Sequence, residues 1–162
     1  MTEQPPETVE LAEGQSTKLT AQQLLKQALA NKTYNEFISF IPYAHLIGTQ
    51  VISMGEELIF KLPERESNIG NLMLPAIHGG CIGGFMENAA ALQIMFTLQT
   101  ERIPKLIDFS IDFLRAGRKR DTYAQCIVVR QGRKIVNVSI SAWQTLQAEP
   151  IATARAHFLV TA

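Results

Sequence analysis

The chain has 162 residues, of which 46% are hydrophobic, and its 15 basic and 15 acidic residues cancel to zero net charge at pH 7. This length and composition fit one domain with a single core, and the balanced charge excludes a strong field that would attract nucleic acid or an anionic membrane. We therefore expect neither as a partner. Cys81 and Cys126 lie far apart among apolar neighbours, which indicates free buried thiols and a reducing compartment.

The first 19 residues form a polar, acidic stretch that contains prolines. This stretch has neither the basic start nor the apolar centre of a signal peptide, so we predict a disordered tail over 1–19 and a single domain over 20–162. No run of 18 uninterrupted apolar residues occurs in the chain. The sequence therefore favours a soluble, cytoplasmic protein.

Two short helices are predicted after the tail. Thr20 and Gln23 have the spacing of a capping box, which starts a helix over about residues 20–31. Thr33, with a glutamate three residues later, repeats this signal, and the apolar face that follows ends at Pro42.

The middle of the chain is predicted to hold a hairpin, a loop and a buried helix. Residues 45–62 surround the turn-like "SMGEE" and are typical of two strands, and residues 63–71 are polar and loop-like. The segment from Gly79 to about Gln99 is apolar nearly all round, which indicates a helix buried on most sides.

Four strands are predicted to follow this helix. "KLIDFSIDFLRAG" alternates with a period of two, which predicts a core face made of Ile107, Phe109, Ile111 and Phe113. The segments "DTYAQCIVVR", "KIVNVSISAWQT" and "PIATARAHFLV" supply three more strands, with inward rows made of Val136, Val138, Ile140 and Ala142, and of Ala152, Ala154 and Ala156. The fold class is α+β, with a sheet wrapped around the long helix.

The predicted central helix carries a single carboxylate, Glu87, within a strip of very small side chains. At about 100° per residue, the strip on this side consists of Gly80, Gly83, Gly84, Ala90 and Ala91. Such a strip lets a ligand or another backbone approach the carboxylate. It also fits a tight helix contact in an oligomer, with Glu87 solvated at its edge.

The start of this helix has the pattern of an anion site. His78 precedes the helix, and Gly79 and Gly80 occupy its first positions, where backbone N–H groups have no intrahelical acceptor. These donors can hold an anion or a developing oxyanion. In the alternative interpretation, His78 only caps the helix and the glycines permit a sharp turn. Nine residues of helix place Glu87 roughly 13 Å from His78, so a shared site would need two antiparallel helices related by a dyad.

The segments "LPAIHGGCIGGFMENAA", "IDFSIDFLRAG", "GRKIVNVSISAW" and "PIATARAHFLV" resemble the PaaI-type thioesterases of the hotdog fold, over nearly all of residues 35–160. The resemblance implies a curled antiparallel sheet around a central helix, homodimers often paired into tetramers, and hydrolysis of acyl-coenzyme A thioesters. It also implies that Glu87 is the catalytic carboxylate, as general base or as nucleophile. The Gly79 N–H would polarise the thioester carbonyl, and His78 would support that loop.

The chain departs from the family pattern at two positions. Leu72 stands where members usually carry an amide, so we expect Asn71 to take that role, and Ala91 stands where some members carry a hydroxyl. These departures favour an alternative from another class, a non-catalytic dimer that binds acyl groups or acyl-CoA. A hotdog dehydratase is a weaker third option, because no paired Asp and His of the hydratase type is found.

The run "RAGRKR" at residues 115–120 is the densest basic segment and is either a phosphate site for coenzyme A or a solvated turn. We assign Gly80, Arg118 and Arg120 to substrate binding.

The chain's three histidines lack metal-ligand spacing, so we expect no metal and no cofactor. The acyl group is not specified, and medium-chain and aromatic groups remain open.

Overall fold

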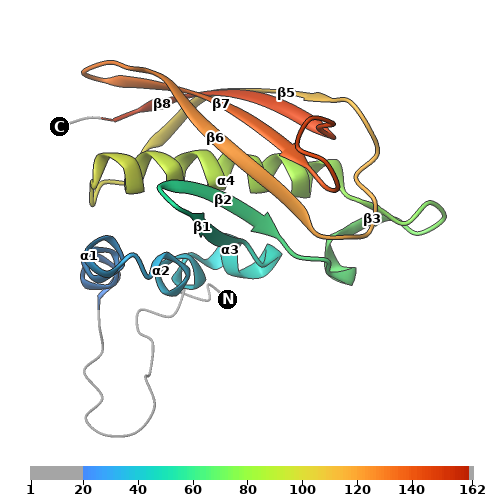
Figure 1. Ribbon diagram of the computed structural model, residues 1–162, viewed down its shortest axis with the longest axis horizontal. Coiled ribbons are helices and arrows are strands. Elements are labelled where there is room, and N and C mark those ends of the chain that lie inside the picture. The colour runs from blue at the N-terminus through green and yellow to red at the C-terminus, as the bar shows by residue number, and fades with distance from the viewer. Residues whose placement is uncertain (1–19, 161–162) are drawn as a thin grey trace, which may run out of the picture.

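The computed structural model describes residues 20–160, in which a curled antiparallel sheet wraps around one long helix (Figure 1). The helix is α4 (Gly79–Leu98). The strands, in their order across the sheet, are β1 (Gln50–Met54), β2 (Glu57–Leu62), β6 (Thr122–Gln131), β7 (Ile135–Trp143), β8 (Ala152–Leu159) and β5 (Lys105–Phe113). This is the hotdog arrangement, so the α+β fold prediction is confirmed. The predicted tail, 1–19, and residues 161 and 162 lie outside the described residues.

The core lies between α4 and the inner face of the sheet. Half of the α4 residues are buried, and the two predicted inward rows on β7 and β8 are buried as well. The inward side chains of β8 are alanines, whose small size lets α4 approach this part of the sheet closely. α4 is long and apolar enough to span a membrane by length and composition alone, but half of that window is buried inside the domain, as in the core helix of a globular protein.

Three helices precede the sheet: α1 (Ala21–Asn31), α2 (Tyr34–Phe40) and α3 (Pro42–Ile47). The capping box of Thr20 and Gln23 is confirmed. The second capping prediction is wrong, because Thr33 makes no side-chain cap bond at the start of α2. α3 was not predicted: Pro42 ends α2 but also begins a new helix, where proline's fixed φ is favourable and its missing N–H costs nothing.

These helices cover the side of α4 that faces away from strands β5–β8 (Figure 1). Tyr34 of α2 stacks on Phe96 of α4 with ring centroids 4.3 Å apart, and Phe37 meets the same ring edge-on at 6.4 Å. α3 contacts α4 directly. The N-terminal helices are therefore part of the core packing, and they place α3 beside the middle of α4.

The connection from the hairpin to α4 is more ordered than the predicted loop. β1 begins at Gln50 rather than at His45, because His45 belongs to α3. Residues 63–71 contain a short 3₁₀ helix, η1 (Glu66–Asn68), and β3 (Ile69–Asn71), which pairs with β4 (Ala76–Ile77) in a separate two-stranded sheet.

The core-facing row predicted for β5 is only partly correct. Phe109 and Ile111 are half-buried against the core, but Ile107 is 55% exposed and Phe113 is 54% exposed. A β-bulge between Leu106 and Asp108 breaks the alternation around Ile107. β5 is also an edge strand, so only one of its sides is covered by a neighbouring strand.

Cys81 and Cys126 are free and buried, as predicted. Burial raises the pKa of both thiols, far above the usual range for Cys126. Both side chains are therefore packed, neutral thiols at neutral pH, and neither has the lowered pKa of a reactive cysteine.

Candidate functional site

The first turn of α4 is capped by the histidine that precedes it. His78 Nδ1 accepts a hydrogen bond from the Gly80 N–H at 3.0 Å, and the His78 carbonyl accepts one from the Cys81 N–H at 2.9 Å. The Gly80 N–H is thus already used within the chain. Gly79 is the first residue of α4, so its own N–H lacks an intrahelical acceptor and lies at the positive end of the helix dipole.

A groove of about 400 Å³ opens at Gly79. Its lining includes Ile82 of α4 and Phe113 of β5. A Cβ atom added to Gly79 would lie 3.3 Å from the Phe113 ring, so glycine leaves the helix start open to this groove. The arrangement presents a backbone donor within an apolar wall, as an oxyanion site requires.

The groove at Gly79 adjoins a second one that contains the predicted arginines. Both grooves share Arg115 and Ala116 in their linings, and the second, of about 290 Å³, also contains Arg118 and Arg120. Arg115 belongs to the same basic run but was not assigned to the site from the sequence. Apolar and cationic surface therefore form one path from the start of α4.

The backbone around the arginines is held by one glutamine. The Gln144 side chain accepts a hydrogen bond from the Arg118 N–H at 3.0 Å and donates one to the Arg118 carbonyl at 2.7 Å. Arg120 Nη1 donates to Thr145 Oγ1 at 3.3 Å. Lys119 pairs with Glu64 and Glu66 instead. Two of the three consecutive cations thus line the second groove, while the third has carboxylate partners.

Glu87 lies half-buried in the middle of α4, two turns beyond Gly79. α4 is continuous over this distance, so one chain keeps Glu87 and His78 roughly 13 Å apart. At 100° per residue, Glu87 points between the directions of Gly83 and Gly84. Gly83 faces Phe109 and Ile111 of β5.

Gly84, on the other side of Glu87, is covered by Tyr43 of α3. A Cβ atom added to Gly84 would lie 2.8 Å from Tyr43 Cε1 and 3.0 Å from Cζ. The small-residue strip is therefore partly filled by the chain's own tyrosine. Burial raises the pKa of the Tyr43 phenol, and Cys81, where that thiol ionises at high pH, and Glu87 raise it further.

Asn71, the predicted family amide, lies exposed at the end of β3. Its Oδ1 atom accepts hydrogen bonds from the backbone N–H groups of Met73 and Leu74, each at 3.0 Å. The side-chain oxygen thus stabilises the turn between β3 and β4. Any catalytic role would have to use the Nδ2 group.

Asn68 is the buried amide of this region, with 6% exposure. Its side-chain Nδ2 group donates to the Ile47 carbonyl at 2.9 Å, and its backbone carbonyl accepts from the His78 N–H at 2.8 Å. The sequence offers no local signal for this role, because Asn68 and Asn71 stand in the same polar segment.

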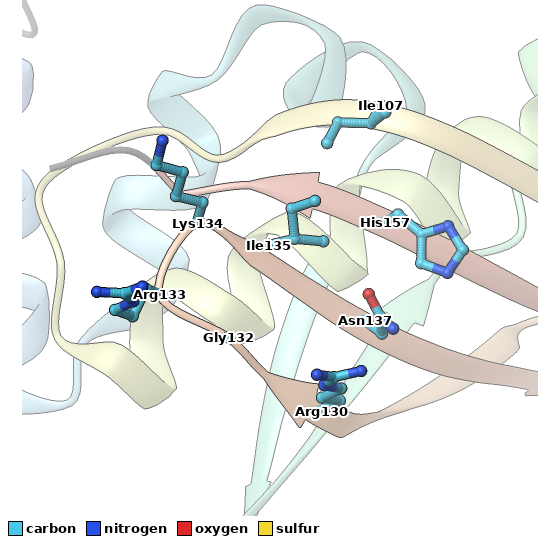
Figure 2. A pocket seen from close by; sticks show the side chains of 8 residues that line it. All are labelled: Ile107, Arg130, Gly132, Arg133, Lys134, Ile135, Asn137 and His157. Carbon is cyan, nitrogen blue, oxygen red and sulfur yellow. The ribbon is translucent and has the colours of Figure 1, made fainter.

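A separate basic groove of about 1130 Å³ lies on the outer face of the sheet (Figure 2). Asn137 lies between Arg130 and His157, which are its cross-strand partners on β6 and β8. His157 Nδ1 lies 3.3 Å from Asp108 Oδ2. Further lining comes from Ile107, Gly132, Arg133, Lys134 and Ile135. This groove and the groove at Gly79 have no lining residue in common.

Comparisons with known proteins identify the family. The profile of the thioesterase superfamily matches residues 74–151. A solved protein from Chromobacterium violaceum is 40% identical to this chain, over 85% of this chain and 96% of its own length, with a TM-score of 0.70. The chain belongs to the thioesterase superfamily. No curated protein matches it.

Two more distant structures share the superfamily fold. A phenylacetic acid degradation-related protein from Ralstonia eutropha is 18% identical, over 85% of this chain and 99% of its own, with a TM-score of 0.69. A Streptococcus mutans protein, solved with bound acetyl-CoA, is 19% identical, over 70% of this chain and 88% of its own, with a TM-score of 0.59. The fold is therefore the one that the resemblance to PaaI-type proteins implies.

The part of the chain that matches the thioesterase superfamily profile contains Gly79, Glu87 and the arginine groove. Tyr43 and Asn68 lie before it. The matched region is nevertheless contacted by both, because Tyr43 of α3 packs on Gly84 and the Asn68 carbonyl at the end of η1 accepts from the His78 N–H.

Proposed function

We propose that the protein hydrolyses acyl-CoA thioesters at sites shared between the two copies of a homodimer. The observation that carries this proposal is the Gly79 N–H, which has no acceptor within α4 and lies in a groove that continues into the groove of Arg118 and Arg120. A thioester carbonyl at Gly79 would lie near cations suited to the phosphates of coenzyme A. Superfamily membership and the acetyl-CoA bound by the Streptococcus mutans neighbour support the substrate class.

The proposed reaction is addition of water to the thioester carbonyl carbon. Glu87 accepts a proton from water as the new C–O bond forms, and the Gly79 N–H stabilises the resulting oxyanion. The C–S bond then breaks, and the leaving thiolate of coenzyme A takes the proton back from Glu87. The products are a free acid and coenzyme A. His78 keeps the first turn of α4 in place through its bond to Gly80.

A nucleophilic route uses the same residues. A Glu87 oxygen attacks the carbonyl carbon and the C–S bond breaks, so coenzyme A leaves as the thiolate and takes a proton from solvent. Water then hydrolyses the mixed anhydride to the free acid and the Glu87 carboxylate. Turnover in heavy-oxygen water separates the two routes. Water that attacks the anhydride at the Glu87 carbonyl carbon labels the Glu87 carboxylate, whereas the general-base route labels only the free acid. Label on Glu87 therefore identifies the nucleophilic route.

The proposed dimer forms along β5. β5 is the edge strand next to α4, and an unpaired edge that carries the exposed side chains Ile107 and Phe113 is suited to pairing with another strand. Antiparallel pairing of two β5 strands about a dyad would set two α4 helices side by side and antiparallel. Glu87 of one copy would then approach Gly79 of the other. Pairing of two dimers into a tetramer is implied by the resemblance alone.

The test compares single substitutions in an assay for free thiol across a panel of acyl-CoAs. Glu87→Gln should abolish turnover. Gly79→Pro removes the oxyanion donor at a helix position where proline is favoured, and the extended backbone of His78 (φ −60°, ψ 130°) suits a following proline. We expect kcat to fall about 10²- to 10³-fold. Gly79→Ala keeps the N–H but crowds Phe113 at 3.3 Å, so it should lose less activity than Gly79→Pro. The proposal fails if the parent releases no thiol from any acyl-CoA, or if Glu87→Gln stays fully active.

A non-catalytic acyl-CoA-binding dimer is the second candidate. Two observations favour it: Ala91 provides no hydroxyl, and Asn71 uses its side-chain oxygen in a turn. Such a protein would bind acyl-CoA in calorimetry without releasing thiol, and Glu87→Gln would leave that affinity unchanged.

A further inference from the structure

We propose that Tyr43 is a positioning residue for Glu87: its hydroxyl, which lies over Gly84 three residues away, turns to donate to the carboxylate and orients it for the reaction. This inference rests on the proposed function, because it assigns a role next to the same carboxylate. It adds a residue from α3, outside the part of the chain that matches the superfamily profile.

The contact with Gly84 places Tyr43 beside Glu87. Tyr43 lies so close to Gly84 that a methyl group there would overlap the tyrosine ring. Gly84 and Glu87 are three residues apart on one helix, a spacing at which side chains are neighbours, with Cβ atoms about 5–6 Å apart. Tyr43 is 42% exposed, so it covers Gly84 without sealing the strip from solvent. Glycine is costly inside a helix, and its presence at position 84 is explained by the space that Tyr43 needs there.

The helix that carries Tyr43 is fixed at its C-terminal end. Arg65 Nη1 donates to the carbonyls of His45 and Leu46 at 3.3 and 3.1 Å, and Asn68 Nδ2 donates to the Ile47 carbonyl at 2.9 Å. The last carbonyls of a helix lack intrahelical donors, and these side chains supply them. α3 has only six residues, so such external bonds decide where Tyr43 lies.

The phenol is suited to donate a hydrogen bond to a carboxylate. Its pKa is raised by burial first, then by Cys81 where that thiol ionises at high pH, and then by Glu87, so the hydroxyl keeps its proton at neutral pH. A neutral phenol next to an ionised carboxylate acts as donor and restricts its rotamers. The same relationship works in reverse: loss of the Glu87 charge should lower the pKa of Tyr43.

The first measurement is kinetic. Tyr43→Phe removes the oxygen alone, and we expect kcat to fall about tenfold with KM nearly unchanged, because the lost contact orients the carboxylate rather than the substrate. Tyr34→Phe is the matched control, since Tyr34 stacks on Phe96 in the core and has no proposed role in the site. Its kcat should equal that of the parent.

The second measurement needs no activity. In NMR of ring-labelled tyrosine, the Tyr43 signal is assigned by its absence from Tyr43→Phe, and its alkaline titration is followed in the parent and in Glu87→Gln. We expect the Tyr43 titration to move to lower pH in Glu87→Gln.

The outcomes separate this inference from the proposed function. If the parent shows no turnover, or if Glu87→Gln keeps full activity, the thioesterase proposal fails, and the titration still tests the pairing of Tyr43 with Glu87. If Glu87→Gln is inactive but Tyr43→Phe keeps full kcat, Tyr43 has no positioning role. The inference is also overturned if Tyr43 titrates at the same pH in Glu87→Gln as in the parent.

Discussion

The backbone carbonyl of Asn68 accepts a hydrogen bond from the backbone N–H of His78 at 2.8 Å. The Asn68 side chain at the same time holds α3 through the Ile47 carbonyl at 2.9 Å. One buried residue therefore joins the cap of α4 to the helix that carries Tyr43. In the proposed enzyme, these two bonds connect the turn that holds the oxyanion donor Gly79 to the helix that places Tyr43 near Glu87.

Substitution of Asn68 should cost both stability and geometry. Asn68→Ala leaves the Ile47 carbonyl without its donor in a buried position, so we expect the free energy of unfolding to fall by about 1–3 kcal/mol. Asn71→Ala is the comparison. The Met73 and Leu74 N–H groups that it leaves without an acceptor are exposed and can bond to water, so the loss of stability should be smaller. Urea denaturation measures both. Equal losses in the two variants would contradict the special role of Asn68.

Alanine at the two neighbouring glycines of α4 should have unequal effects. Gly83→Ala places a methyl group 3.9 Å from Phe109 and 4.0 Å from Ile111, which is ordinary contact, so the gain in helix propensity should stabilise the protein by up to about 1 kcal/mol. Gly84→Ala would push aside the half-exposed Tyr43 side chain, so the same gain should be offset and the stabilisation should be smaller. Thermal unfolding of both variants measures the difference. Equal stabilisation by the two substitutions would contradict the packing of Tyr43 on Gly84.

The central elements of the fold could be predicted because each carries its own periodicity. α4 is apolar on all sides, β7 and β8 alternate cleanly, and their positions were predicted closely. α3 was missed because Pro42 was read only as the end of a helix, although proline is equally suited to begin one. The bulge near Ile107 was missed because an alternating pattern does not show where a strand gains a residue.

The site was predictable only in part for a related reason. Gly79 and His78 stand next to each other, and helix-start chemistry is visible in such short spacing. The contact of Tyr43 with Gly84 joins residues 41 positions apart, and the two bonds of Asn68 reach 21 residues back and 10 forward. No local pattern encodes contacts of that range, because the packing of α3 on α4 creates them.

The ion pair between Lys61 and Asp121 should set part of the acid stability. Lys61 Nζ lies 2.7 Å from Asp121 Oδ2, and the Glu64 N–H donates to Asp121 Oδ1 at 2.9 Å. The bond from Lys61 first, and the bond from Glu64 second, hold the pKa of Asp121 below its ordinary value of 3.8. A lowered pKa in the folded state contributes stability that is present above the ordinary pKa and is lost as pH falls through the folded-state value.

Asp121→Asn should therefore be less stable than the parent at neutral pH, and the gap should close below about pH 4. Urea denaturation across this pH range measures it. Asp112→Asn, at an exposed position on β5, serves as control and should keep the parent's pH dependence. A gap between parent and Asp121→Asn that persists at low pH would contradict the ion-pair explanation.

Coenzyme A should bind more weakly when the arginine groove loses its charge. Arg118→Ala and Arg120→Ala each remove a cation from the groove that adjoins Gly79, so we expect product inhibition by coenzyme A to weaken about 3- to 10-fold in each. Arg133→Ala, in the separate groove of Figure 2, is the matched control. Unchanged inhibition constants for Arg118→Ala and Arg120→Ala would remove the phosphate assignment. A larger effect of Arg133→Ala would move that assignment to the outer face of the sheet.

A site shared between two copies predicts that two inactive variants restore each other. Glu87→Gln lacks the carboxylate and Gly79→Pro lacks the oxyanion donor. In a mixed dimer, one site would receive both substitutions and the other would receive neither. Random mixing of equal amounts should therefore give about a quarter of the parental activity, because half of the dimers are mixed and each holds one intact site.

The mixture is prepared by unfolding and refolding the two variants together, with each variant refolded alone as control. Because α4 separates Gly79 and Glu87 by two helical turns, neither residue can reach the other within one copy. A mixture as inactive as its components, in dimers shown to have exchanged by mass spectrometry of isotope-labelled chains, would mean that Glu87 of one copy and Gly79 of the other do not form one site. With a parent that turns over acyl-CoA, that result would exclude the dyad arrangement of β5 and α4.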